Sequence, residues 1–194
     1  PDLIFITGDS VDKTEKIESL NDFLQLIDNS IKKYAITGNW EYWGKVDLTK
    51  LKNTYSKNNC ELLINENRTI SIKNREISII GIDDLVGGNA DFEKAVENLK
   101  QTETNIVLSH CPEYRDIITK KKENLNIDLV LSGHTHGGQI TFLGIVPFKP
   151  QGSGKYLKGW YKESEPKMYI SKGIGTSILP IRFGARAEMV QMEI

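Results

Sequence analysis

The sequence predicts an α/β fold built around a mainly parallel β-sheet. Short apolar runs of the kind that form buried strands occur at residues 3–7, 34–37, 105–109 and 127–131. Residues 17–31 lie between the first two runs and repeat apolar side chains at helical spacing. A strand, a helix and a second strand in this order form a βαβ unit, in which the two strands are parallel.

The same patterns predict the remaining elements. The short strands between residues 60 and 82 alternate apolar and polar side chains and are separated by turn-like breaks, so we expect an antiparallel run. Asn89 or Asp91 is a candidate cap for a helix at residues 91–100. Residues 147–166 are rich in proline and glycine and are predicted to form a loop. The other predicted elements are helices at 46–58 and 113–122 and strands at 60–65, 69–73, 76–82, 139–142, 168–171 and 187–194.

Composition and charge indicate an ordinary globular chain and exclude some partners. The 194 residues suffice for one sizeable domain, with 39% hydrophobic and 26% charged residues. The net charge of -1 gives no global attraction to nucleic acid, so a phosphate-bearing substrate would need local positive charge, such as metal ions. Two cysteines do not make a disulfide scaffold, and neither a membrane span nor a signal peptide is visible.

Side chains with metal-binding chemistry follow four of the predicted strands. Asp9 and Asn39 come after the first two, His110 follows the third, and His134 and His136 follow the fourth. Sites in parallel sheets gather at the carboxyl ends of strands. One carboxylate, one amide and three imidazoles suit Mn, Fe or Zn better than Ca, and a set without cysteine is more typical of a catalytic than of a structural site. The alternative for the paired histidines is one capping and one exposed side chain.

These residues lie in four motifs that resemble those of the calcineurin-like metallophosphoesterases. Residues 8–12 match Gly-Asp-x-x-Asp, residues 38–41 match Gly-Asn-His-Asp/Glu except at Trp40, residues 109–110 match the single-histidine motif, and residues 133–136 match Gly-His-x-His. The resemblance covers essentially the whole chain. It implies two mixed β-sheets packed as a sandwich and flanked by helices in four layers. The Gly-His-Thr-His-Gly-Gly-Gln version is similar to a bacterial branch that includes membrane-associated UDP-diacylglucosamine-type pyrophosphatases.

The resemblance implies a dinuclear metal-dependent hydrolase of phosphoric esters or phosphoanhydrides. Two divalent ions, Mn, Fe or Zn, would activate a bridging hydroxide and neutralise the phosphoryl oxygens. Asp9 would bridge the two ions, and His136 would be a ligand of the first ion. Asp12 would not contact an ion but would support the ligand side chains. The second ion would take its other protein ligands from Asn39, His110 and His134. The implied substrate is a small phosphorylated molecule, with a nucleotide-linked lipid or sugar as candidates, and no nucleic acid partner is expected.

The family's first motif, Asp-x-His, is absent and would precede Pro1. We therefore expect a single domain over residues 1–194 that lacks its first strand and holds one ion or none. Membrane association, if any, would come from the missing segment, with a location in the cytoplasm or peripheral to a membrane. The alternative is a catalytically degenerate module of the same fold that binds a metal or a partner.

A second departure concerns the leaving group. The family position of Trp40 usually holds a histidine, and indole cannot act as a general acid, so we expect a preference for anhydrides or esters with good leaving groups. Glu41 is a candidate substitute acid or a structural carboxylate. Trp40 and Trp43 form an aromatic wall for a base or acyl chain, or pack in the core. Arg182 and Arg186 are candidates to bind phosphate, or else form surface ion pairs.

Overall fold

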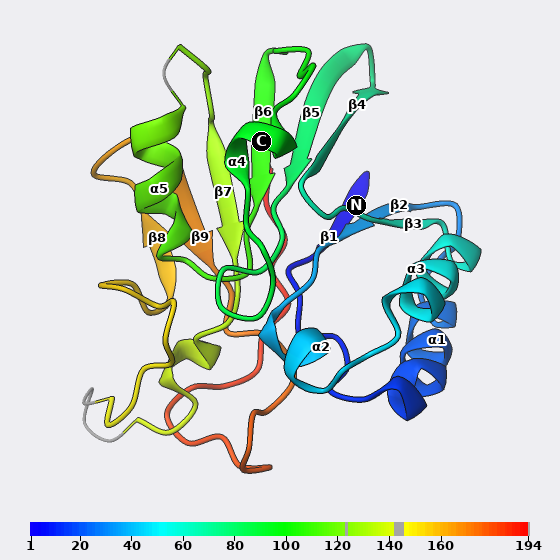
Figure 1. The fold of residues 1–194 in the computed structure, drawn as a ribbon, viewed down its shortest axis with the longest axis vertical. Helices are drawn as coiled ribbons and strands as arrows, with labels where there is room; N and C mark the ends of the chain where they lie inside the picture. The colour runs from blue at the N-terminus through cyan, green and yellow to red at the C-terminus, as the bar shows by residue number, and fades with distance from the viewer. Residues whose placement is uncertain (123, 142–145, 194) are drawn as a thin grey trace.

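A computed structural model describes residues 1–122, 124–141 and 146–193 and shows two β-sheets packed face to face (Figure 1). Within these residues the first sheet has the order β1-β2-β3, and all its neighbours are parallel. Its strands are β1 (Leu3–Ile6), β2 (Lys32–Ala35) and β3 (Cys60–Leu62).

The second sheet is mixed and has the order β4-β5-β6-β7-β9-β8 in the described residues. Its four central strands are parallel to one another, while β4 and β8 pair antiparallel at the two edges. The strands are β4 (Glu66–Ile72), β5 (Arg75–Gly81), β6 (Thr104–Leu108), β7 (Leu129–Ser132), β8 (Gly159–Tyr161) and β9 (Lys167–Ile170).

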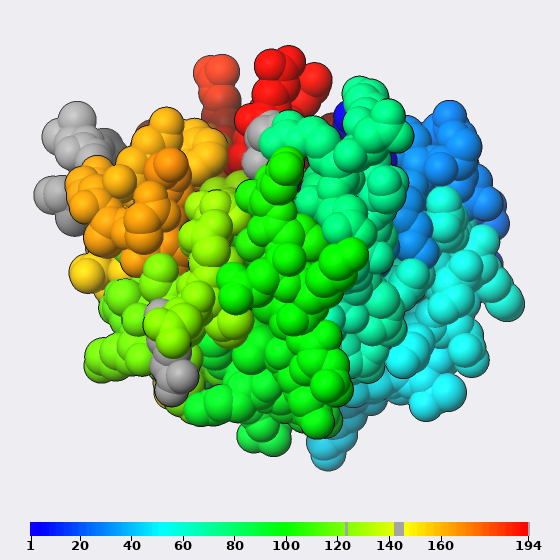
Figure 2. Space-filling view, turned by 90° about the horizontal axis from the view of Figure 1, so that it is seen from above, coloured from blue at the N-terminus to red at the C-terminus, as the bar shows by residue number. Residues whose placement is uncertain are grey.

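Helices cover the outer face of each sheet, which completes the four layers expected for the fold. Helices α1 (Ile17–Gln25) and α3 (Leu48–Lys57) pack on the first sheet, and α4 (Phe92–Ala95) and α5 (Tyr114–Lys121) pack on the second. Figure 2 views the molecule from above and shows the blue and cyan helical layer at one side and the orange β8 and β9 at the other. The short helical segments η1 (Thr14–Lys16), α2 (Asn39–Trp43) and η2 (His136–Gly138) complete the described elements.

The period-two alternation of strand side chains determines which layer each residue enters. In β6, Ile106 and Leu108 pack between the two sheets, whereas Val107 packs under α4 and α5. In β7, Leu129 and Val130 divide in the same way. Because both faces are buried, these strands are continuous apolar runs in the sequence.

The antiparallel run predicted for residues 60–82 is only partly correct. Strands β4 and β5 pair antiparallel, but β3 pairs parallel with β2. The reason is that α3 returns the chain across the first sheet as a second βαβ crossover. Leu62 then packs on the helical layer, and Leu63 packs between the sheets.

Several predicted boundaries and elements also differ from the structure. Helix α1 ends at Gln25 rather than at residue 31, β8 lies inside the predicted loop at 147–166, and α2 was not predicted. Residues 187–193 form no strand, because alternation alone does not supply a strand edge to pair with, and Ile194 lies outside the described residues. The predicted strand at 139–142 is reduced to bridges of Ile140 with residues 183 and 184, and Phe142 lies outside the described residues.

Two smaller features complete the description. Asp91 rather than Asn89 caps α4, since its carboxylate accepts a hydrogen bond from the Lys94 N–H at 3.0 Å. Across the described ranges, no helix has both the length and the apolar character needed to cross a bilayer.

Gly81 sets the closest approach of the two sheets. A Cβ at this position would lie 2.3 Å from the Cβ of Leu63, so we expect Gly81→Ala to lower the free energy of unfolding by about 1–3 kcal/mol. Urea denaturation measures the change. Gly175→Ala is the matched control, because a Cβ there meets nothing within 4 Å. Equal unfolding midpoints for the two variants would contradict this packing.

Candidate metal centre

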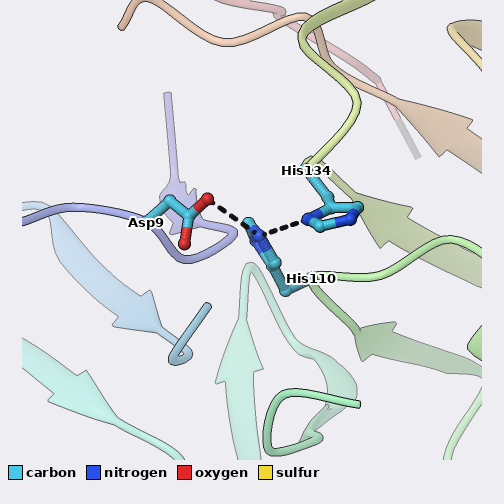
Figure 3. A group of neighbouring side chains, drawn as sticks. All are labelled: Asp9, His110 and His134. Atoms are coloured by element: carbon cyan, nitrogen blue, oxygen red, sulfur yellow. Dashed lines mark hydrogen bonds and ion pairs between the residues drawn. The ribbon is translucent and has the colours of Figure 1, made fainter. Parts of the chain in front are cut away.

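Three of the predicted metal ligands meet at the carboxyl ends of the strands (Figure 3). Asp9 follows β1, His110 follows β6 and His134 follows β7, and their ligand atoms lie within 4.8 Å of one another. Asn39, the first residue of α2, joins them through its amide oxygen. Parallel strands explain the convergence, because their carboxyl ends lie at the same edge of each sheet.

The Nε2 atom of His110 lies at the centre of the group. It is 3.1 Å from the Asp9 Oδ2, 3.2 Å from the Asn39 Oδ1 and 3.1 Å from the His134 Nδ1. His110, His134 and Asn39 are buried, and the Asp9 side chain is largely buried. The group is therefore a compact polar cluster that is shielded from most of the solvent.

Backbone carbonyls on the far side of each ring fix the histidine tautomers. The His110 Nδ1 lies 2.6 Å from the Thr7 carbonyl oxygen, and the His134 Nε2 lies 2.7 Å from the Gln151 carbonyl oxygen. A carbonyl only accepts, so each of these nitrogens carries a proton. In the neutral histidines, the inner nitrogens that face Asp9 then present lone pairs.

When His110 is neutral, four lone-pair atoms converge, which is the arrangement that a bound cation requires. Ligands about 2.0–2.2 Å from one metal ion lie roughly 3–4.4 Å from each other. The three separations from the His110 Nε2 are 3.1–3.2 Å, and the ligand atoms of Asp9, His110 and His134 all lie within 4.8 Å of one another. Mixed oxygen and nitrogen donors suit Mn, Fe or Zn. The residues present therefore fit a divalent ion.

Electrostatics support the same conclusion. Burial lowers the pKa of His110, but the Asp9 carboxylate outweighs burial and raises it to about 9. Burial raises the pKa of Asp9, but His110 outweighs it and leaves the value lowered. Burial and then the charge of His110 lower the pKa of His134 to about 4. The negative potential that attracts a proton to His110 also attracts a metal ion, and the two compete.

Glu41 acts on the backbone around this cluster. Its carboxylate is 1% exposed, and burial, followed by the Asp9 charge, raises its pKa to about 7. It accepts hydrogen bonds from four backbone N–H groups, those of Gly38 (2.8 Å), Asp9 (3.1 Å), Ser10 (2.6 Å) and Val11 (3.3 Å). Of the two roles the sequence left open, these contacts favour the structural one, in which Glu41 positions the loops that carry Asp9 and Asn39.

The backbone at the cluster is unusual. Asp9, His134 and His136 have φ values of 54°, 68° and 50°, in the left-handed region that costs other residues more than it costs Asp and His. Gly38 is required by close approach, since a Cβ there would lie 2.3 Å from the Asp9 Oδ1 and 2.8 Å from the His110 Cε1. Local strain is thus concentrated where the ligand side chains turn inward.

His136 is not part of the three-residue group. Its Nδ1 lies 3.1 Å from the Arg182 guanidinium, and burial, followed by the Arg182 charge, lowers the pKa of His136. Arg182 also donates to the carbonyl oxygens of Lys172 and Gly175, each at 2.7 Å. Arg182 therefore attaches the segment after β9 to the loop that carries His136. This role is neither phosphate binding nor a surface ion pair, the two roles that the sequence left open.

The remaining predicted residues lie at the surface. Trp40 is half-buried and packs edge to face with the exposed Trp43, at a centroid distance of 5.5 Å. This places the pair beside Asn39 and outside the core. Asp12 and Arg186 are exposed, and neither side chain forms a hydrogen bond or ion pair with another described residue.

Two supporting contacts were not found from the sequence. The Gln151 carbonyl that fixes the His134 tautomer belongs to the predicted loop at 147–166, and a backbone carbonyl carries no side-chain signal. Asp83 accepts hydrogen bonds from the Thr37 hydroxyl at 2.7 Å and from the Tyr42 hydroxyl, and so joins β5 to the end of β2. The sequence predicts a loop or helix-capping role for Asp83, because it follows a strand and matches none of the family motifs.

The fold and the donor set together define a class, that of the metal-dependent phosphoester hydrolases. Residues 1–138 match the family model described as calcineurin-like phosphoesterase, and the chain belongs to this family. Among its relatives, the Bacillus subtilis metallophosphoesterase YkuE is 31% identical over 97% of this chain. The Escherichia coli phosphodiesterase YaeI is 29% identical over 100% of the chain, and a bovine transmembrane protein with metallophosphoesterase domain is 30% identical over 99%.

The chain spans only part of these relatives, covering 66% of YkuE, 70% of YaeI and 45% of the bovine protein. Two solved structures share its fold. The Thermus thermophilus sulfate thiohydrolase SoxB aligns with a TM-score of 0.52 at 15% identity, covering 87% of this chain and 33% of its own. The Haemophilus influenzae NAD nucleotidase NadN aligns with a TM-score of 0.54 at 17% identity, covering 88% and 40%.

Replacing Glu41 tests its positioning role. Glu41→Ala leaves four backbone N–H groups without their acceptor, so we expect the free energy of unfolding to fall by about 2–4 kcal/mol. We also expect weaker Mn(II) binding in isothermal titration. Glu41→Gln keeps one oxygen acceptor and should lose less, and Glu93→Ala, at an exposed carboxylate, is the control. Unchanged stability with abolished turnover would instead identify Glu41 as an acid.

Proposed function

We propose that the chain forms the catalytic domain of a dinuclear hydrolase that cleaves phosphoric esters or phosphoanhydrides. The observation that carries the proposal is the convergence of four lone-pair atoms from Asp9, Asn39, His110 and His134. A divalent ion held there, Mn, Fe or Zn, would supply positive charge to the phosphoryl oxygens and lower the pKa of water.

The chain's own residues would place a substrate at this site. We propose His136 and the bridging carboxylate of Asp9 as ligands of a second ion, with Arg182 orienting the His136 ring from 3.1 Å. Arg186 is exposed and so accessible to a phosphate oxygen, and Asp12 stays a predicted supporting residue. The half-buried Trp40 beside Asn39 supports a flat group of the substrate, such as a base, packing on the indole.

The substrate class follows from the missing acid. Trp40 cannot protonate a leaving group. The Glu41 carboxylate is already engaged, because it accepts hydrogen bonds from four backbone N–H groups. Substrates whose leaving group needs no proton are therefore favoured, which includes nucleotide-linked lipids and sugars joined through a phosphoanhydride. The name of the Escherichia coli relative supports phosphodiesters as a further class. The name of the bovine relative, a transmembrane protein, supports hydrolysis of substrates at a membrane.

A non-catalytic metal-binding module is the alternative. It is favoured by one observation, namely that His136 contacts Arg182 rather than the group formed by Asp9, His110 and His134. Metal binding without turnover of any phosphoester, whichever of Mn, Fe or Zn is added, would support the module over the hydrolase.

Metal binding can be tested by thermal unfolding. Saturation at about 100 times the dissociation constant stabilises a protein by about 2.7 kcal/mol, so we expect Mn(II) to raise the Tm by roughly 5–10 °C, and EDTA to reverse the shift. His110→Ala and His134→Ala should lose the shift, because each removes a ligand of the converging group. His136→Ala should keep the part of the shift that comes from the ion at the converging group. A shift that survives His110→Ala would contradict this site.

The leaving-group preference can be tested at Trp40. A histidine can protonate an alkoxide, and general acid catalysis contributes about 10²–10⁴-fold, so Trp40→His should raise turnover of an alkyl phosphodiester at least about tenfold relative to a nucleoside diphosphate sugar. Turnover is measured with Mn(II) in the full chain. Trp43→His, at the exposed partner of the aromatic pair, is the matched control. An unchanged ratio in Trp40→His would refute the explanation.

A further inference from the structure

We propose that the end of the molecule that carries the metal site docks on an anionic lipid bilayer through residues 174–183, the apolar loop. Every large apolar side chain in this loop is exposed: Ile174 (54%), Ile178 (84%), Leu179 (51%), Ile181 (56%) and Phe183 (57%). Single exposed apolar side chains are ordinary on a protein surface, but five in one ten-residue loop indicate an interaction site.

Gln139 attaches the apolar loop to the turn after β7 that carries His134 and His136. Its side-chain oxygen accepts from the Ser177 N–H at 2.8 Å, and its side-chain nitrogen donates to the carbonyl oxygens of Ser177 and Leu179 at 2.9 Å each. A second attachment is the contact of Arg182 with His136. The apolar loop therefore lies at the carboxyl ends of the strands, at the same end of the molecule as α2 (Figure 1).

The tip of the loop is held in an unfavourable conformation. Ile178 has a φ of 56°, which is a genuine outlier for a β-branched residue. Its side chain is the most exposed in the loop and gains no packing from the protein in return. Such strain persists where the surroundings enforce it, here through the hydrogen bonds of Gln139 on either side, and it is characteristic of functional segments.

Two segments at this end of the molecule are basic, namely residues 172–190, which contain the loop, and residues 146–158, which contact the turn at His134 and Thr135. Residues 146–158 contain Lys149, Lys155 and Lys158 and no acidic residue, and residues 172–190 contain three basic residues and only Glu188 as an acid. The two segments together carry a net charge of +5 in a chain of net charge -1, so the rest of the chain carries -6. Phe148, beside Lys149, adds a further exposed aromatic ring at 71%.

Apolar side chains among basic ones are the combination that binds an anionic bilayer, because the basic residues are attracted to its negative surface. A second copy of the chain fits less well, since a symmetric contact would bring two positive faces together. The bilayer is thus the occupant that matches both the apolar and the charged character of this face. Docking does not depend on the proposed hydrolysis, because it concerns binding alone.

Vesicle co-sedimentation tests the proposal with the whole chain. We expect binding to vesicles of phosphatidylcholine with about one quarter phosphatidylglycerol, and weak binding to phosphatidylcholine alone. Ile178→Ser combined with Leu179→Ser should reduce the partition coefficient at least about tenfold, since two apolar side chains would no longer enter the hydrocarbon. Arg186→Glu should weaken binding to the anionic vesicles about tenfold, and added salt should do the same.

Leu26→Ser is the matched control. Leu26 is 83% exposed and follows α1, which packs on the first sheet far from the apolar loop. The partition coefficient of the Leu26→Ser variant should therefore equal that of the wild type. All of these positions are exposed, so each variant should keep its unfolding midpoint. Four results would overturn the proposal: no vesicle binding, equal binding to neutral vesicles, equal loss in Leu26→Ser, or a dimer in size-exclusion chromatography that Ile178→Ser dissociates.

Discussion

The hydrogen bonds of the buried Glu41 carboxylate are the interaction on which the site depends. They join the segment after β1, which carries Asp9, to the segment after β2, which carries Asn39. Asp9 has a left-handed backbone conformation, and such a residue keeps its place only when the surrounding structure determines it. The N–H groups of Asp9, Ser10 and Val11 all donate to this one buried carboxylate, and each would lose its hydrogen bond if the two segments separated.

The remaining ligands depend on the second sheet in the same indirect way. His110 and His134 leave adjacent parallel strands, and each ring is oriented by a carbonyl on its outer side, from Thr7 in one case and Gln151 in the other. Those carbonyls decide which nitrogen faces inward, so the donor chemistry of the cluster is determined by groups that a metal ion would never touch. Because Thr7 follows β1, the His110 ring also links the two sheets at their common edge.

The sequence predicts most of the fold and the core of the site, for a physical reason. Strands buried on both faces are mostly apolar, so the apolar parts of β6 and β7 are recognisable from composition, and the residues that end these strands share one edge. Features that depend on pairing partners are not visible in this way. The parallel pairing of β3, the absence of a strand at 187–193 and the hold of Arg182 on His136 all depend on segments distant in sequence, whose positions local patterns do not encode.

The Gly-His-Thr-His-Gly-Gly-Gln motif joins the polar and apolar parts of this end of the molecule. His134 turns inward to the cluster, while Gln139, only five residues later, fixes the tip of the apolar loop. One turn therefore sets the distance between the atoms that would hold a metal ion and the exposed apolar side chains of the loop. Phosphates of a bilayer lie just outside its hydrocarbon region, and a protein resting on that boundary through its apolar loop would direct the ends of its strands toward the layer where those phosphates are found.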